Sequence, residues 1–129
     1  MTVLSQYHPP VGARPYQLVF GMGGDLAAVT TGDHTTLRAP TAFTLTGVKA
    51  SLYDDSSSGV VELALKKNGV DMLSTNVTID SGEKTSVTAA IPAVISVTAV
   101  AADDELTVEV IDDGTAATGA VFVLEGTIP

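Results

Sequence analysis

Clusters of carboxylates are the residues of this sequence that come closest to chemical machinery. They are Asp54–Asp55, Asp103–Glu105 and Asp112–Asp113, each beside turn-forming residues. Acidic loops at one end of a β domain can bind Ca²⁺, which takes about six to eight oxygen ligands. The spacing matches no EF-hand loop, and Asp is also common in turns because its side chain bonds nearby backbone. We therefore predict turn-forming and solubilising roles, with no bound metal or other cofactor.

The histidines and hydroxyl residues form no recognisable catalytic motif. His8 and His34 are the only histidines, and they follow Tyr7 and Asp33 in separate parts of the chain. A catalytic triad or a zinc site needs partner groups at fixed geometry, and no nucleophile-elbow, zincin or phosphate-loop motif is present. Two carboxylates from distant strands would still suit glycoside hydrolysis. With no Trp and 3 Tyr, however, the chain supplies few residues for stacking on sugars, and we predict a non-enzymatic protein.

The charge balance argues against several classes of partner. The chain has 15 acidic and 6 basic residues, a net charge of −9, and its bases form no stripe. Nucleic acids and anionic lipid surfaces attract clustered Lys and Arg, so neither is an expected partner. The most apolar stretch, 89–102, contains Pro92 and is shorter than the ~20 residues of a spanning helix. The first residues lack the pattern of a signal peptide, so we expect the protein to stay in the producing cell or to leave by lysis.

Valine and threonine dominate the sequence and indicate its architecture. There are 17 of each among 129 residues, in short alternating runs separated by Gly, Asn and Asp, and there is no cysteine. β-Branched side chains fit a pleated sheet and lose rotamer freedom in a helix. The sequence predicts an all-β, antiparallel, jelly-roll-like β-sandwich of about eight strands over residues 16–129, preceded by an extended arm over residues 1–15.

Two details of the strand pattern lead to specific predictions. Within 42–53 the apolar positions switch from odd to even at Thr46–Gly47, which requires a bulge or a corner. Asn68–Gly69 is a strong turn signal, and a three-residue loop over 67–69 would set Leu63 opposite Leu73. The inward positions of the clearest strands are Val61, Leu63, Leu65, Leu106, Val108 and Val110.

Further strands are predicted in the C-terminal third of the chain. Residues 85–94 and 95–100 form strand candidates, with Pro92 at an edge or bend. The last strand, 120–126, is apolar on both faces, which places it centrally or at a subunit contact. For this reason Phe122 and Leu124 are predicted contact residues.

The N-terminal segment and the apolar surplus also indicate contacts between subunits. Apolar residues make up 45% of a strongly charged chain, and an intersubunit surface would absorb the excess. Proline-containing steps favour an extended segment that can lie over a neighbour. The apolar and aromatic residues concerned are Val3, Leu4, Tyr7, Val11 and Tyr16. We predict that these residues contact a neighbouring subunit of a homo-oligomer or another partner protein, and a frayed chain terminus is the alternative interpretation.

Several segments together resemble a known family. They are 42–52 (AFTLTGVKASL), 66–69 (KKNG), 73–86 (LSTNVTIDSGEKTS), 101–108 (AADDELTV) and the strand at 119–126. This string of strands and turns resembles a β-sandwich module that recurs in virion proteins of tailed bacteriophages, including tail and fibre proteins and small head-associated proteins. The resemblance covers about residues 30–127 and carries no catalytic motif, so it implies no active-site residue.

The resemblance implies two alternative roles in the virion. The first is a capsid decoration (cement) protein, expected to be a trimer, that is made in the bacterial host cytoplasm and binds the major capsid protein on the outer head surface. Its arm or an apolar edge would clamp adjacent capsomers, and its acidic face would point to solvent. The second is a tail or tail-fibre component that binds a host-surface glycan or links tail parts. A carbohydrate-active enzyme is a third and weaker interpretation.

Overall fold

The computed structural model describes residues 14–129, which contain eleven strands and one short 3₁₀ helix, η1 (Ser86–Thr88). The strands are β1 (Arg14–Gly21), β2 (His34–Arg38), β3 (Phe43–Ser51), β4 (Val61–Lys67), β5 (Val70–Asp71), β6 (Leu73–Thr75), β7 (Val77–Ile79), β8 (Val94–Ile95), β9 (Ala99–Val100), β10 (Glu105–Asp113) and β11 (Val121–Ile128). The predicted antiparallel all-β class is confirmed. More strands are found than the eight or so expected, because β5 to β9 are only two or three residues long.

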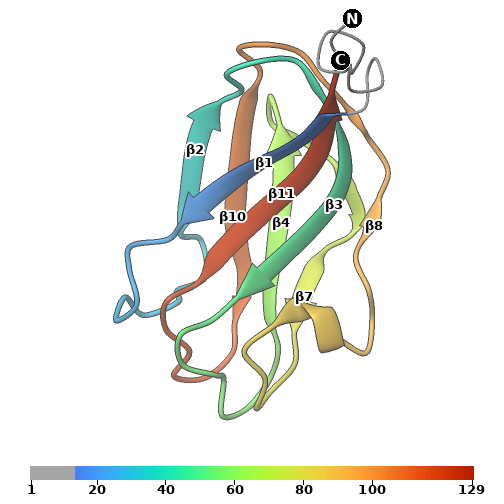
Figure 1. Ribbon diagram of the computed structural model, residues 1–129. Helices are drawn as coiled ribbons and strands as arrows, with labels where there is room; N and C mark the ends of the chain where they lie inside the picture. The colour runs from blue at the N-terminus through green and yellow to red at the C-terminus, as the bar shows by residue number, and fades with distance from the viewer. Residues whose placement is uncertain (1–13) are drawn as a thin grey trace, which may run out of the picture.

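The strands form two main layers that pack face to face (Figure 1). One sheet has the order β1-β11-β3-β9, and the other has the order β2-β10-β4-β5, with β7 also paired to β4. A small third sheet joins β6 to β8, and every strand pair is antiparallel. In Figure 1 the strands β1, β11 and β3 lie in front of β2, β10 and β4. β1 begins at Arg14, within the segment that the sequence assigned to the arm.

The core lies between the two sheets and follows the period of two in each strand. From β4 and β10 the predicted inward residues are all buried, and the facing sheet contributes an edge-to-face pair between Phe20 and Phe122, with ring centroids 6.3 Å apart. Each fully buried aliphatic or aromatic side chain contributes roughly 1.5–3 kcal/mol by leaving water. Packing of this kind is the source of stability in a chain that has no cysteine.

The predicted irregularity at Gly47 is a β-bulge. Glu125 pairs with Gly47 and Gly126 pairs with Leu45, so Thr46 is an extra residue with no partner on β11. The bulge shifts the phase of β3, which buries Phe43 and Leu45 before it and Ala50 after it. β3 stays in one sheet along its whole length, so the change of phase is met by a bulge and not by a corner.

The predicted three-residue loop at Gly69 is wrong. Lys67 pairs with Val70, so the loop is the two residues Asn68 and Gly69, both at positive φ (51° and 82°). These angles suit a type I′ hairpin turn. The three-residue loop was predicted to set Leu63 opposite Leu73 in one continuous partner strand, but the partner of β4 is not continuous. After β5 the chain leaves β4, pairs with β8 through β6, and returns as β7 with Val77 opposite Leu63.

The strand predicted over 85–94 is also wrong. Its start is the helix η1, capped by the Thr85 hydroxyl, which accepts a hydrogen bond from Val87 N at 3.2 Å. The Asp80 carboxylate then accepts a hydrogen bond from Ala90 N at 2.9 Å. Such bonds from side chains compete with a strand ladder for backbone groups. From the region 85–100, only Val94–Ile95 and Ala99–Val100 are strands.

Candidate interaction surface

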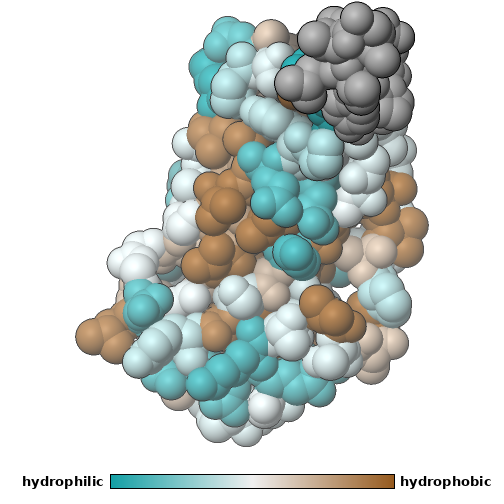
Figure 2. Space-filling model, viewed as in Figure 1, coloured by the Kyte–Doolittle hydropathy of each residue, from teal (hydrophilic) through white to brown (hydrophobic). Residues whose placement is uncertain are grey.

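The outer face of the β1-β11-β3 sheet carries three neighbouring valines, which we call the valine face: Val19, Val121 and Val123. Their neighbours Phe20 and Phe122 are buried, so the alternation along β1 and β11 turns the valines outward. Val19 is 61% exposed and pairs with the half-buried Val123. Figure 2, viewed from this side, shows apolar surface gathered at the middle of the sheet with hydrophilic surface around it.

Polar side chains border the valine face. Glu125 lies on the same face of β11, accepts a hydrogen bond from Gln17 Nε2 at 3.3 Å and lies 3.6 Å from Lys49 Nζ. A Cβ on Gly47 would approach Glu125 Oε1 to 3.2 Å, so the glycine leaves room for this side chain. Exposed ion pairs contribute little to stability. Their effect here is to surround an apolar centre with a polar rim, the usual anatomy of a protein interface.

The residues predicted to make subunit contacts lie in three different places. Phe122 and Leu124 are at most 1% exposed in the core of the protomer, so their prediction as contact residues is wrong and the outward residues of that strand are Val121 and Val123. Tyr16 is half-buried, and its ring packs 5.1 Å from that of Phe43. Val3, Leu4, Tyr7 and Val11 lie outside the described residues.

A groove of about 300 Å³ lies where the β3 edge is left open beside the segment that was predicted to be a strand. Its walls come from β3, β7 and the chain around η1, and include Val48, Val77, Ile91 and Ile95. Ile91 is 65% exposed. The lining is mostly aliphatic, with small hydroxyl groups and the charged Lys49, and its aliphatic part can accept apolar side chains.

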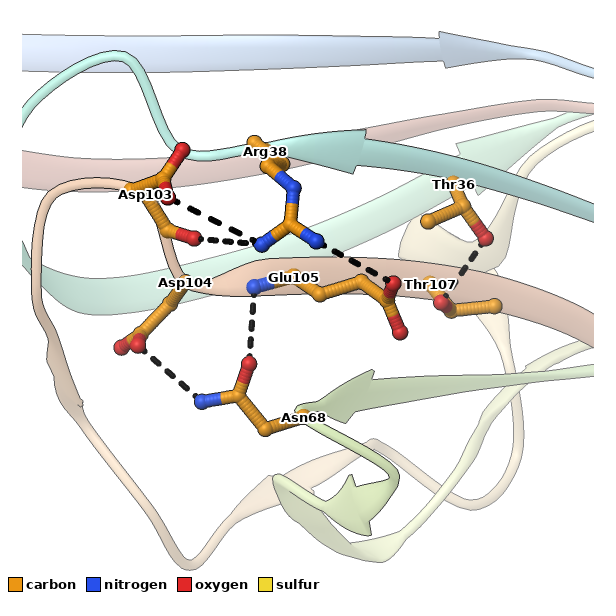
Figure 3. A network of polar contacts seen from close by, with 7 residues as sticks. All are labelled: Thr36, Arg38, Asn68, Asp103, Asp104, Glu105 and Thr107. Carbon is orange, nitrogen blue, oxygen red and sulfur yellow. Dashed lines mark hydrogen bonds and ion pairs between the residues drawn. The ribbon is translucent and has the colours of Figure 1, made fainter.

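The acidic cluster at 103–105 organises the turns at one end of the sandwich (Figure 3). Asn68 Nδ2 donates to Asp104 Oδ1 at 3.0 Å, and Asn68 Oδ1 accepts from Glu105 N at 2.9 Å. The bond from Asn68, followed by one from the backbone of Ala101, lowers the pKa of Asp104 below its ordinary value. Arg38 lies 3.8 Å from the Asp103 carboxylate and 4.0 Å from that of Glu105.

The other two acidic clusters also accept hydrogen bonds, and in the cluster 54–55 the Asp54 Oδ2 atom accepts from Thr118 Oγ1 at 3.4 Å. Asp113 Oδ2 accepts from Thr31 N at 3.1 Å, and Asp112 Oδ1 accepts from Gly114 N at 3.2 Å. Among residues 14–129, no group of three or more His, Cys, Asp or Glu side chains is arranged to hold a metal ion. His34 begins β2, where its Nδ1 lies 3.3 Å from Gly32 O, and His8 lies outside the described part of the chain.

Sequence reasoning missed the role of Ser56, which lies in the loop 54–59. Within residues 14–129 it is the one polar residue that is fully buried, and its hydroxyl accepts from Thr115 N at 2.9 Å. The Ser56 carbonyl accepts from Gly82 N at 2.8 Å. The residue therefore joins three loops. The only signal for it in the sequence is a serine-rich turn, which does not distinguish Ser56 from the serines beside it.

Within residues 14–129, no helix is both long enough and apolar enough to cross a membrane. Comparison of the chain with known proteins found no matching family model and no matching curated protein.

Proposed function

We propose that this protein is a non-enzymatic structural protein of a tailed-phage virion, and that it decorates the outer surface of the head by binding the major capsid protein. The observation that carries the proposal is the valine face, an apolar centre on a hydrogen-bonded sheet with a polar rim. The resemblance of residues 30–127 to virion β-sandwich modules is the reason for proposing a tailed-phage virion. The acidic exterior suits a protein whose other surfaces face solvent.

Weak contacts of this size are sufficient on a capsid. Burying the exposed part of a few valines contributes on the order of 1 kcal/mol each. A single site of that strength would dissociate readily, whereas contacts linked within an oligomer bind cooperatively because the second contact is intramolecular. The segment 1–13, with Val3, Leu4, Tyr7 and Val11, would supply a second contact that holds a neighbouring capsomer.

The test is the occupancy of purified protein on heads that lack it, measured by co-sedimentation and electron microscopy. The double variant Val121→Thr/Val123→Thr keeps β-branched residues on β11 and should lose at least tenfold in affinity for heads. Ile111→Thr is the matched control, because Ile111 is an exposed aliphatic residue of the opposite sheet. Unchanged binding of the double variant would overturn the role of the valine face.

Truncation separates the contribution of the N-terminal segment. Deleting residues 1–12 leaves Arg14, which pairs with Ile128 and bonds Pro129, and should reduce occupancy without changing the melting temperature. Full occupancy after truncation would overturn the clamp. Labelling the protein on intact particles settles its location, and density on the tail would support the alternative of a tail or fibre component.

A further inference from the structure

Among residues 14–129, no strand pairs with the outer edge of β1. Met22 N donates to Ala120 O, so even-numbered residues of β1 direct their backbone groups toward β11 and odd-numbered residues direct theirs away. The hydroxyl of Thr35 donates to Gly21 O at 3.0 Å, which confirms the outward direction of that carbonyl. Within the described residues, the outward groups of Gln17 and Val19 have no backbone partner.

The edge of β1 also lacks the devices that usually prevent pairing between proteins. Edge strands are commonly protected by charged side chains, prolines or bulges. β1 has Arg14 and Pro15 at its start, and from Tyr16 to Gly21 it has no charge and no proline. The corresponding edge strand of the other sheet, β2, ends at Arg38, which lies beside two carboxylates. In a chain of net charge −9, β1 is thus an edge without any carboxylate to repel a copy of itself.

We propose that two copies of this chain pair antiparallel through their β1 strands, with the two-fold axis at Leu18. In this register Gln17 lies opposite Val19 of the second copy. These two residues exchange both of their backbone hydrogen bonds, and the symmetric pair does the same. The pairing joins the β1-β11-β3-β9 sheets of the two copies into one continuous sheet, and it brings the two valine faces onto the same side.

The ends of β1 select this register. Pro15 lies opposite Gly21 of the second copy and accepts its N–H. Pro15 has no N–H to return, and none is needed, because the Gly21 carbonyl already accepts from Thr35. Moving the axis to Gln17 would set Val19 opposite Pro15 and leave the Val19 carbonyl without a donor. Moving it to Val19 would set Gln17 N–H against the occupied Gly21 carbonyl.

The side chains on the core side of β1 are complementary in the same register. Leu18 meets Leu18 of the second copy at the axis, at a non-hydrogen-bonded position where Cα atoms lie about 4.5 Å apart. Leu18 and Tyr16 are only half-buried in the protomer, so both have surface left to bury. Tyr16 lies opposite Phe20 of the second copy. A two-fold contact of this kind closes on itself and gives a dimer, which differs from the trimer expected from the sequence.

The experiment is sedimentation equilibrium of the full chain in the micromolar range, with proline substitutions at matched edge positions. Val19→Pro removes an outward N–H that has no partner within the described part of the chain, and should weaken dimerisation at least tenfold. Thr36→Pro is the control, since Thr36 is an outward residue of the β2 edge, and should leave the dimer intact. If Val19→Pro fails to fold by circular dichroism, Gln17→Lys/Val19→Lys replaces it, because it sets two lysines against each other across the pair.

A monomeric or trimeric wild-type chain would overturn the proposal, and so would a dimer that Val19→Pro or the double lysine variant leaves unchanged. The pairing does not depend on the proposed function. A dimer in solution that fails to bind heads would overturn decoration alone, whereas a monomer that occupies heads would overturn the pairing alone.

Discussion

Replacing Ser56 by Ala is expected to lower the free energy of unfolding by about 1–3 kcal/mol. The side chain is fully buried, and its hydroxyl lies 2.8 Å from both Ser58 O and Gly59 O while it accepts from Thr115 N at 2.9 Å. One hydroxyl hydrogen serves one carbonyl at a time. The substitution therefore removes one donated and one accepted hydrogen bond, each worth roughly 0.5–1.5 kcal/mol net.

The free energy of unfolding is measured by urea denaturation. An unchanged m-value shows that the variant exposes the same surface on unfolding as the wild type, so that a lower midpoint reports lower stability. In a domain of this size the loss corresponds to roughly 4 °C of melting temperature per kcal/mol. Ser57→Ala is the matched control, since Ser57 is exposed and its hydroxyl is 3.4 Å from Thr115 O. It should change stability by less than about 0.5 kcal/mol. Equal values for the two variants would refute the argument and would mean that water replaces the Ser56 hydroxyl at no cost.

The remaining predictions concern the last strand and the Asn68 turn. Leu124→Ala should lower the free energy of unfolding by about 2–5 kcal/mol, measured by urea denaturation, because it opens a cavity in the core. Val123→Ala on the outer face should lower it by less than about 1 kcal/mol. Equal losses for the two variants would contradict the assignment of Leu124 to the inner face and Val123 to the outer face of β11. Asn68→Gly keeps a residue that tolerates the positive φ and should raise the pKa of Asp104 toward its ordinary 3.8, as measured by NMR titration of the carboxyl group. Because that pKa is lowered in the folded state, the contribution of Asp104 to stability is present above 3.8 and is lost as the pH falls through the folded-state value. An unshifted titration in Asn68→Gly would show that the pKa is lowered by a group other than Asn68.

The parts of the fold that could be predicted are the strands with one polar and one apolar face. In β10, Leu106, Val108 and Val110 alternate with polar residues, and the structure buries all three. The bulge at Gly47 was predictable for the same reason, since a strand with a buried face cannot change phase without an irregularity.

The parts that could not be predicted depend on contacts between distant residues. The residues 85–94 alternate weakly, and the hydrogen bond from Ala90 N to Asp80, ten positions away, takes a backbone group that a strand would use. The loop at Asn68 was predicted to have three residues instead of two, because the prediction paired β4 with one long strand. The structure instead divides that partner among β5, β6 and β7, with β6 paired to β8.

The valine face could have been predicted from the sequence, because polar residues of the same strands indicate which positions face outward. On β11 all four residues from Val121 to Leu124 are apolar, and composition alone cannot tell inside from outside. Glu125 shares the odd phase of Val121 and Val123, and a carboxylate next to the core would lose its hydration unless it were paired. The odd positions of β11 must therefore face outward. On β1, Gln17 fixes the phase of Val19 in the same way. A valine at an outward-facing position of a strand does not pack in the core of its own protomer. Three such valines side by side form an apolar patch of the kind that marks an interaction site.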